Sequence, residues 1–234
     1  RPGYAGAAIA NAAGNTIAAT IYLKADTTGT LYWDSSKTGN FNTAVGTNNV
    51  LTVKDSQNEI SITKTGASGN LAGTSFSLEG TFAAGTSPIT WTTSATNPTN
   101  NPYTITGKLI AGKSYVLKET TPAPGYTKAA DRYLKVDENG KLYQSSTGED
   151  QTWTLVTNKA LTVADTQTTS TLNKVNDAAT PAALTGATFT VTGTFADNST
   201  SLSMLSGAAS QTVTGKFIVG NTYTFTESTS PALY

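Results

Sequence analysis

The chain has 234 residues, a length that allows one or two domains. Its 15 basic and 15 acidic residues cancel, so no electrostatic footprint favours nucleic acid or an anionic membrane. It contains no cysteine and no histidine, which removes the usual side chains of zinc sites, thiol chemistry and imidazole base catalysis. Most hydrolase and oxidoreductase mechanisms are therefore disfavoured, and we expect no metal and no cofactor.

The composition favours strands. Only 13% of the residues are charged, and apolar and hydroxyl residues alternate in segments such as 188–195, which puts the apolar ones on one strand face. No segment has a convincing helical period, no apolar run approaches the roughly 18 residues of a spanning helix, and no charged-then-apolar leader opens the chain. We therefore expect an all-β extracellular protein with no membrane insertion in this segment.

In chain order, the first predicted element is a hairpin over 22–32 with a glycine in its turn. Further strands are predicted near 60–64, 74–82, 103–110, 114–119, 131–137, 141–144, 152–156 and 160–165. The segment 93–102 is rich in Thr, Asn and Pro and is predicted to be a surface loop, because such side chains compete for backbone hydrogen bonds.

A repeat of about 110 residues organises these elements. Three ionisable residues recur in it: Lys64 and Lys174 are 110 residues apart, Asp55 and Asp165 are also 110 apart, and Glu119 and Glu227 are 108 apart. Residues 1–56 match the back half of one unit, 57–166 a complete unit, and 167–234 the front half of another. Each unit has about the size of an immunoglobulin-like sandwich. The predicted fold is therefore all-β, with one complete and two half sandwiches in tandem.

The repeated ionisable residues suggest a reaction. Lys64 lies on the first strand of the complete unit, Asp165 on its last and Glu119 on one between them. First and last strands of a sandwich are commonly neighbours, and an ion pair buried between them would be expensive. Desolvation favours the uncharged amine and acid. The amine can then attack the carboxyl carbon, with the second carboxyl moving protons and water leaving. The product would be an amide cross-link.

The segments that carry these residues resemble a known family. Tyr115-Val116-Leu117-Lys118-Glu119-Thr120, followed by Pro124-Gly125-Tyr126, is similar to the E-box of Cna B-type domains, the stalk modules of Gram-positive pilins and surface adhesins. The sequences ending in Lys64 and in Asp165 resemble the family's cross-linking lysine and its Asn or Asp partner.

The resemblance implies an isopeptide bond between Lys64 and Asp165, promoted by Glu119. In the terminal halves Lys174 and Glu227 match the lysine and the glutamate, and Asp55 matches the acceptor. It implies a structural segment of a cell-surface or cell-wall fibre, pilus or adhesin stalk. Such a segment is no enzyme for other substrates, since the bond forms once within the chain. Two departures are Asp in place of the commoner Asn acceptor, and no glycine before Tyr234.

Alternative interpretations remain open. Asp137-Glu138-Asn139-Gly140 could suggest calcium, but it fits a polar hairpin turn better. Trp33, Trp91 and Trp153 could stack on a glycan, although packing explains each. The loop 85–101 is longer than its counterpart after Phe195 and is the best candidate for recognising a host protein or glycan. A ligand-binding adhesin domain is therefore the alternative function.

The half units allow two further readings. Successive copies of the chain could complete each other head to tail, sealed by a bond between Lys174 and Asp55. Alternatively, the sequence is a window on a longer repetitive chain, and adjacent repeats are the partners. Pro124-Gly125-Tyr126 also matches Pro2-Gly3-Tyr4, and Tyr234 matches the same tyrosine, so the halves overlap by a few residues.

Overall fold

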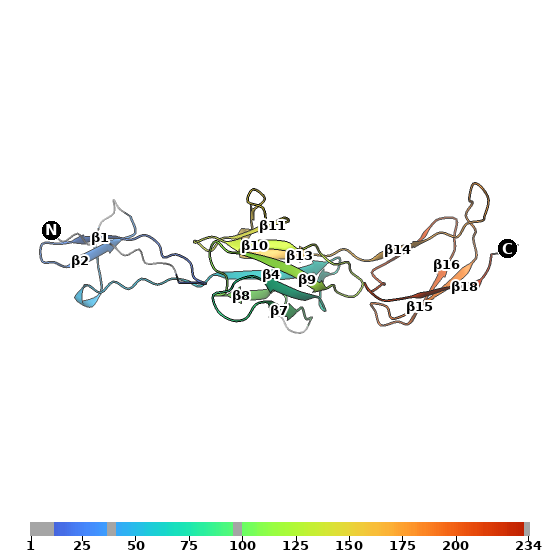
Figure 1. Cartoon of the computed structure of the whole chain (residues 1–234), viewed down its shortest axis with the longest axis horizontal. Coiled ribbons are helices and arrows are strands. Elements are labelled where there is room, and N and C mark those ends of the chain that lie inside the picture. The colour runs from blue at the N-terminus through green and yellow to red at the C-terminus, as the bar shows by residue number, and fades with distance from the viewer. Residues whose placement is uncertain (1–11, 37–40, 96–99, 232–234) are drawn as a thin grey trace.

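The computed structural model describes residues 12–36, 41–95 and 100–231. The described chain is nearly all-β, as predicted, and its only helices there are two short 3₁₀ turns. Three groups of strands follow one another along an elongated molecule, with the N-terminal and C-terminal groups on opposite sides of the central one (Figure 1). No helix among the described residues is long and apolar enough to cross a membrane.

The central group is a two-layer sandwich. Its elements are β4 (Glu59–Gly66), β5 (Gly69–Asn70), β6 (Ser75–Glu79), β7 (Ile89–Thr92), β8 (Tyr103–Thr106), β9 (Ser114–Thr121), β10 (Arg132–Val136), β11 (Leu142–Ser145), β12 (Thr154–Leu155), η2 (Thr157–Lys159) and β13 (Ala160–Ala164). One sheet has the order β12-β11-β10-β9-β6-β7, and the other the order β13-β4-β5 with β8 paired to β4. The two sheets enclose a core of buried aliphatic and aromatic side chains, as expected for sandwich packing.

The first and last strands of this sandwich are neighbours. β13 runs parallel to β4, with Leu161 beside Ile62 and Val163 beside Lys64. Leu161 and Val163 are both buried, so the apolar side chains of β13 point into the core at every second position. This pairing fixes where the residue after the strand, Asp165, enters the interior.

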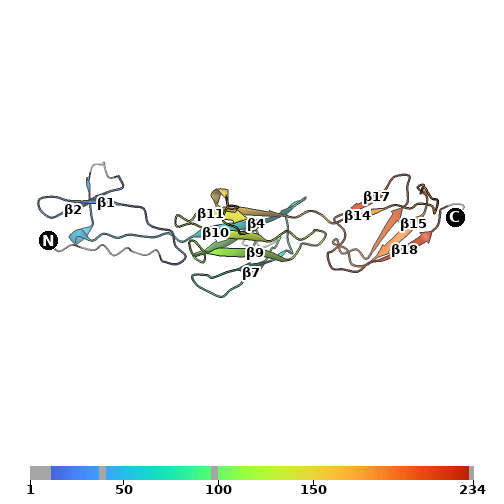
Figure 2. The ribbon, with the colours of Figure 1, turned by 45° about the horizontal axis from the view of Figure 1, so that its top comes forward.

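The terminal groups each reproduce a part of the sandwich. The N-terminal group has β1 (Tyr22–Ala25), β2 (Leu31–Asp34), β3 (Thr43–Ala44) and η1 (Thr47–Asn49). The C-terminal group has β14 (Thr169–Leu172), β15 (Thr188–Thr192), β16 (Ser201–Leu205), β17 (Gln211–Thr214) and β18 (Thr224–Thr229). The order β1-β2-β3 corresponds to β10-β11-β12, and the order β16-β15-β18 corresponds to β7-β6-β9. Figure 2 shows β14 and β17 together, apart from β15 and β18; their pairing matches that of β4 with β8.

The C-terminal group also keeps the register of the central one. Phe189 lies opposite Glu227, just as Phe76 lies opposite Glu119. In both pairs the register shifts at the residue before the phenylalanine. A shared irregularity of this kind indicates that the two groups are built to the same plan.

The joints between the groups are alike. At the first, the Thr16 N–H donates to Ser56 O (2.7 Å) and the Asn58 N–H donates to Gly14 O (2.8 Å). At the second, the Thr127 N–H donates to Thr166 O (2.8 Å) and the Thr168 N–H donates to Gly125 O (2.9 Å). Each joint is therefore a short antiparallel bridge between neighbouring groups.

A glycine makes each joint possible. Gly14 and Gly125 have φ of +84° and +82°, and a Cβ at either would collide with the carbonyl oxygen of Gly107 or Gly215. Gly14 is thus the structural counterpart of Gly125. This corrects the match of Pro124-Gly125-Tyr126 to Pro2-Gly3-Tyr4. Residues 2–4 and Tyr234 lie outside the described residues.

Two local predictions have clear outcomes. The segment 137–140 is a hairpin turn, in which Asp137 Oδ1 accepts the N–H groups of Asn139 (3.0 Å) and Lys141 (2.8 Å). The loop prediction for 85–101 is wrong in part, because it contains β7, which pairs with β6. The alternation in Ile89-Thr90-Trp91-Thr92 turns Trp91 into the core, where it stacks on Phe76 at 5.0 Å.

Candidate functional site

Three strands each deliver one ionisable side chain to the same point of the central interior. On β4, Ile60, Ile62 and Lys64 all point inward, because strand side chains alternate. On β9, Glu119 follows the inward residues Tyr115 and Leu117. Asp165 continues the inward positions of β13 by one step. In each case the ionisable residue follows buried apolar residues at the next inward-facing position. The alternation of side chains along the strand therefore places it in the core.

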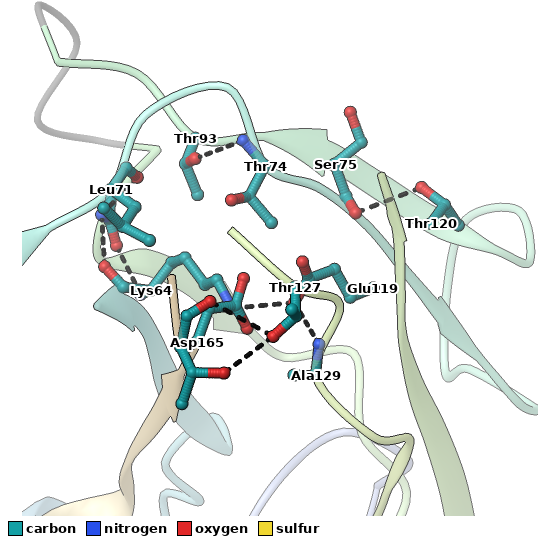
Figure 3. A network of polar contacts seen from close by, with 12 residues as sticks. Lys64, Leu71, Thr74, Ser75, Thr93, Glu119, Thr120, Thr127, Ala129 and Asp165 are labelled. Atoms are coloured by element: carbon teal, nitrogen blue, oxygen red, sulfur yellow. Dashed lines mark hydrogen bonds and ion pairs between the residues drawn. The ribbon is translucent and has the colours of Figure 1, made fainter. Parts of the chain in front are cut away.

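The three side chains meet. Lys64 Nζ donates to Glu119 Oε2 at 2.8 Å and forms an ion pair with Asp165 Oδ1 (Figure 3). None of the three side chains is more than 1% exposed. The amine also lies over the ring of Phe76, 5.9 Å from its centroid. The structure therefore brings together the lysine, glutamate and aspartate that the sequence singled out.

The charges of this triad do not balance. If all three groups ionise, two negative charges and one positive charge share a dry interior, which is costly. Among the described residues, Glu119 Oε1 and Asp165 Oδ2 have no hydrogen-bond partner, so the polar groups of the site are incompletely satisfied. A proton on Glu119 would remove the excess charge.

Glu119 is the group that this environment perturbs most clearly. Burial raises the pKa of its carboxyl above the ordinary value of 4.5, and the hydrogen bond and charge of Lys64 act in the opposite direction. The charge of Asp165 raises the pKa further. Burial dominates. Glu119 is therefore suited to hold a proton and to hand it on, as a general acid and base does.

A buried asparagine positions the lysine. Asn101 Oδ1 accepts the backbone N–H of Lys64 (2.7 Å), and Asn101 Nδ2 donates to the carbonyl oxygens of Lys64 (3.0 Å) and Leu71 (3.1 Å). Sequence reasoning missed this residue, because it placed Asn101 in a polar surface loop. The repeat gave no signal either, since Ala209 stands at the corresponding position of the C-terminal group.

The other predicted site residues form only a partial copy. Lys174 Nζ donates to Glu227 Oε2 at 3.0 Å, but the two side chains are 27% and 31% exposed. Asp55 is exposed, and it belongs to the stretch between η1 and β4, whereas Lys174 follows β14; the N-terminal and C-terminal groups lie at opposite ends of the molecule (Figure 1). The structure therefore joins Lys174 with Glu227 and leaves Asp55 away from both.

The arrangement defines the class of the central group as an immunoglobulin-type sandwich with a buried Lys-Glu-Asp triad. Residues 58–152 match the family model described as SpaA, a prealbumin-like fold domain. This match agrees with the resemblance of the central unit to Cna B-type pilin domains. No curated protein matches the chain.

Several solved structures are similar to the chain. A C-terminal fragment of the pilus adhesin SpaC from Lactobacillus rhamnosus GG is 16% identical, over 75% of this chain and 78% of that one, with a TM-score of 0.40. The open conformation of SpaC is 15% identical, over 95% of this chain and 28% of that one, with a TM-score of 0.41. A streptococcal ancillary pilin is 20% identical, over 78% of this chain and 57% of that one, with a TM-score of 0.34. The chain thus spans only part of the last two proteins.

Proposed function

We propose that the chain is a structural segment of a bacterial surface fibre, pilus or adhesin stalk, and that an amide bond between Lys64 and Asp165 seals its central unit. The observation that carries this proposal is the fully buried triad, which connects the first and last strands of the central sandwich. Residues 58–152 of that sandwich match the SpaA family model. The role is mechanical, and Glu119 acts once on its own chain.

The proposed reaction starts from the ion pair. Lys64 gives up a proton to the carboxyl pair, which leaves a neutral amine, and Asp165 takes a proton to become an uncharged acid. The lysine nitrogen then attacks Cγ of Asp165, and the protonated Glu119 gives its proton to the departing hydroxyl group and takes one proton from the attacking nitrogen, so that Glu119 ends as it began. One C–N bond forms, one C–O bond breaks, and the ammonium and carboxylate become an amide and one water. No outside reactant is needed.

The position of the bond suits a load-bearing module. Tension enters the central unit at the start of β4 and leaves after β13, which lies beside β4. A bond from Lys64 to Asp165 would carry the tension from β4 directly to the residue after β13, so the chain between Lys64 and Asp165 would carry no load. In the chain-entropy model for cross-links, closing a loop of about 100 residues stabilises the fold by about 4.7 kcal/mol.

Intact mass spectrometry of the purified chain tests this proposal. We expect the wild type to weigh one water less than its sequence, and Glu119→Ala to regain that water. Asp177→Ala, an exposed loop aspartate, is the matched control and should keep the loss. A wild-type mass equal to the sequence mass would contradict the cross-link.

The two terminal groups suggest how copies of the chain assemble. We infer that the N-terminal and C-terminal groups are complementary halves of one further unit, so that copies can complete each other head to tail. The support is that the two groups together contain counterparts of the central strands β4 and β6 to β12. Concentration-dependent light scattering of the whole chain tests it, and a monomer at every concentration would contradict it.

A second candidate function is ligand binding by the central unit. A cavity of about 570 Å³ opens between the edges of β7 and β8, and it is lined in part by Thr86, Pro88, Tyr103 and Lys108. Part of it belongs to the stretch 85–101 that the sequence marked as unrepeated. Binding of the chain to immobilised host matrix proteins or glycans tests this role. Lys108→Glu should weaken such binding, and Lys113→Glu, outside the cavity, should not.

A further inference from the structure

The aspartate of the triad lies where its strand ends. Asp165 is the first residue after β13, and its N–H donates to Thr65 O at 2.9 Å. Strand ends open more readily than strand centres, because fewer contacts hold them. The side chain of Asp165 is nevertheless fully buried against Lys64. Contacts beyond β13 must therefore help to hold this end of the strand on the core.

A short segment after β9, residues 125–129, lies at this end of the triad, and we call it the clasp. Its Thr127 N–H donates at 2.8 Å to the carbonyl oxygen of Thr166, the residue after the triad aspartate. Thr127 Oγ1 donates to the same oxygen at 3.2 Å. Further along the clasp, the Ala129 N–H donates to Glu119 Oε2 at 3.4 Å (Figure 3). The clasp thus contacts the surroundings of both triad carboxyls.

The clasp is held in turn by the start of the C-terminal group. The Thr168 N–H donates to Gly125 O at 2.9 Å, and Thr168 Oγ1 donates to the same oxygen at 3.2 Å. Thr168 Oγ1 also donates to Phe217 O at 2.8 Å, and the Gly215 N–H donates to Thr168 O at 2.7 Å. Thr168 therefore connects the clasp on one side with the C-terminal group on the other.

The first joint has the same set of bonds. The Asn58 side chain donates to Leu109 O at 3.0 Å, and the Gly107 N–H donates to Asn58 O at 2.7 Å, as the partners of Thr168 do at the second joint. The residue held there, Ser56, also directly follows an aspartate of the repeat. The arrangement recurs although an amide takes the place of a hydroxyl, so it belongs to the common plan of the units.

We propose that the clasp positions Asp165 for the bond with Lys64, and that the folded C-terminal group holds the clasp in place. This inference rests on the proposed function, because it concerns the rate of that same reaction. The reacting atoms and the proton transfers stay those of the central site. What the clasp adds is the fraction of time for which the aspartate lies beside the amine. The central unit is then sealed fastest when the C-terminal group is already folded.

Positioning matters for this reaction for two reasons. Two groups of one chain react fast only while they stay in contact, and displacement by about 1 Å can cost about a hundredfold in rate. Asp165 is held on one side by Thr65 O and on the other by the clasp, through Thr166. Without the clasp, water would also reach the triad and favour the charged, unreactive forms. Both effects slow the reaction, and neither removes a reactant.

The rate of water loss, measured beside the rate of folding, tests the proposal. The whole chain is isolated in denaturant before it folds, while it still has its full sequence mass, and is then refolded. Mass spectrometry of quenched samples follows the bond, and tryptophan fluorescence follows folding. The three tryptophans, Trp33, Trp91 and Trp153, all lie outside the C-terminal group. Fluorescence therefore reports the folding of the remainder of the chain.

The first variant loosens the joint by one side chain. Thr168→Val removes the hydroxyl that donates to Gly125 O and Phe217 O and keeps the shape of the side chain. We expect water loss to slow by about three- to tenfold, the effect of one hydrogen bond on a rate, at an unchanged rate of folding. Thr168→Ser should restore the wild-type rate. Thr169→Val, at an exposed position of β14, is the matched control and should also keep it.

The second variant changes no residue of the central unit or of the clasp. Phe195→Ala removes a side chain that is 1% exposed in the core of the C-terminal group, and such a cavity destabilises the group around it. We expect the water loss at Lys64 and Asp165 to slow by about tenfold or more, with the fluorescence change unaltered. Leu205→Ala, 61% exposed on β16, is the matched control and should keep the wild-type rate.

The outcomes separate the two proposals. Every variant should reach the same final loss of one water, because all reactants are present. A wild-type rate in Thr168→Val or in Phe195→Ala would overturn the positioning role, and so would a Thr168→Ser chain as slow as Thr168→Val. A wild-type chain that folds and loses no water would instead overturn the proposed function.

Discussion

The central triad and the Lys174–Glu227 pair of the C-terminal group each contain a lysine and a glutamate. The glutamates lie on corresponding strands in corresponding register. The separations of lysine and glutamate differ by only 0.2 Å, from 2.8 to 3.0 Å. The central triad lies between two sheets and includes Asp165. The side chains of Lys174 and Glu227 are partly exposed. The comparison teaches that the order of residues along the chain supplies the lysine and the glutamate, whereas enclosure by the last strands buries them; in the proposed reaction this burial is what makes the groups reactive.

The largest effect is expected when the enclosed lysine is removed. Lys64→Ala should abolish the proposed cross-link, which would contribute about 4.7 kcal/mol in the entropy model, and it leaves two carboxyls in the core without their cation. Removing one member of a buried charge network typically costs about 3 to 5 kcal/mol. Denaturant unfolding of the central unit, followed by tryptophan fluorescence, should show a loss on the order of 5 kcal/mol or more. Lys174→Ala, at the open site, should change this transition by less than about 1 kcal/mol; an equal loss in both variants would remove the distinction between the sites.

The next effect concerns pH. Because burial raises the pKa of Glu119 above 4.5, its acid form persists at pH values where an exposed glutamate is ionised. Above that raised pKa the carboxyl ionises, and the rate of bond formation should fall about tenfold per pH unit. Refolding the denatured, unlinked chain at a series of pH values, with mass spectrometry of quenched samples, measures this rate. A rate that rises steadily with pH would contradict an acid role for Glu119.

The same shift predicts the pH dependence of folding before the bond forms. A carboxyl with a raised folded-state pKa keeps its proton in the folded state while the unfolded chain loses it. Rising pH through this window therefore destabilises the unlinked protein, and the full contribution is present only below the unfolded pKa. The unlinked variant Lys64→Ala, which removes the lysine that lowers the pKa of Glu119 and keeps the burial and the aspartate that raise it, should accordingly unfold more easily as the pH rises above 4.5. The opposite trend would show that Glu119 is ionised in the folded state.

A smaller effect is expected from the asparagine that distinguishes the two sites. Asn101→Ala removes three hydrogen bonds to buried backbone groups, which should cost about 1 to 3 kcal/mol and slow bond formation. Asn100→Ala is the matched control, because Asn100 makes one exposed bond to Thr92 O at 3.1 Å. Unfolding and the quenched mass assay both apply. Equal stability and equal rates of bond formation in the two variants would contradict a role of Asn101 in positioning Lys64.

The smallest effect is expected at the joints. Gly125→Ala places a side chain at φ +82° against Gly215 O, which should cost about 1 to 2 kcal/mol and displace the C-terminal group while the central water loss remains. Gly186→Ala, with φ +88° and open space around it, controls for backbone strain alone. Small-angle scattering of the two variants should show a changed outline only for Gly125→Ala. An unchanged outline in both would mean that the joint tolerates the collision.

Much of the site could be predicted from the sequence, because the repeat marks Lys64, Glu119 and Asp165 by their order and spacing. Strand alternation then explains why they point inward. Apart from β5 and β7, the strands of the central unit were also predicted, since apolar alternation is local information. β7 was missed because its four residues sit in a segment rich in Thr, Ser and Asn, and only the pairing with β6 turns it into a strand.

Other features depend on tertiary contacts that could not be predicted from the sequence. Asn101 is surface-like in composition, and only the position of its loop against β4 buries it. The role of Gly14 was not predicted, because Pro2-Gly3-Tyr4 matches Pro124-Gly125-Tyr126 better in sequence. Only the backbone hydrogen bonds of Gly14 and Thr16 to Asn58 and Ser56 identify Gly14 as the counterpart of Gly125. The exposure of Lys174 and Glu227 could not be predicted either, since it depends on which strands cover their side chains.

The most direct test of the central claim is proteolysis of the unfolded chain followed by fragment mass spectrometry. The account predicts a branched peptide in which Lys64 is joined to Asp165 with the loss of one water, and no cleavage after Lys64 by trypsin. Separate linear peptides carrying a free Lys64 and a free Asp165 at full mass would contradict it.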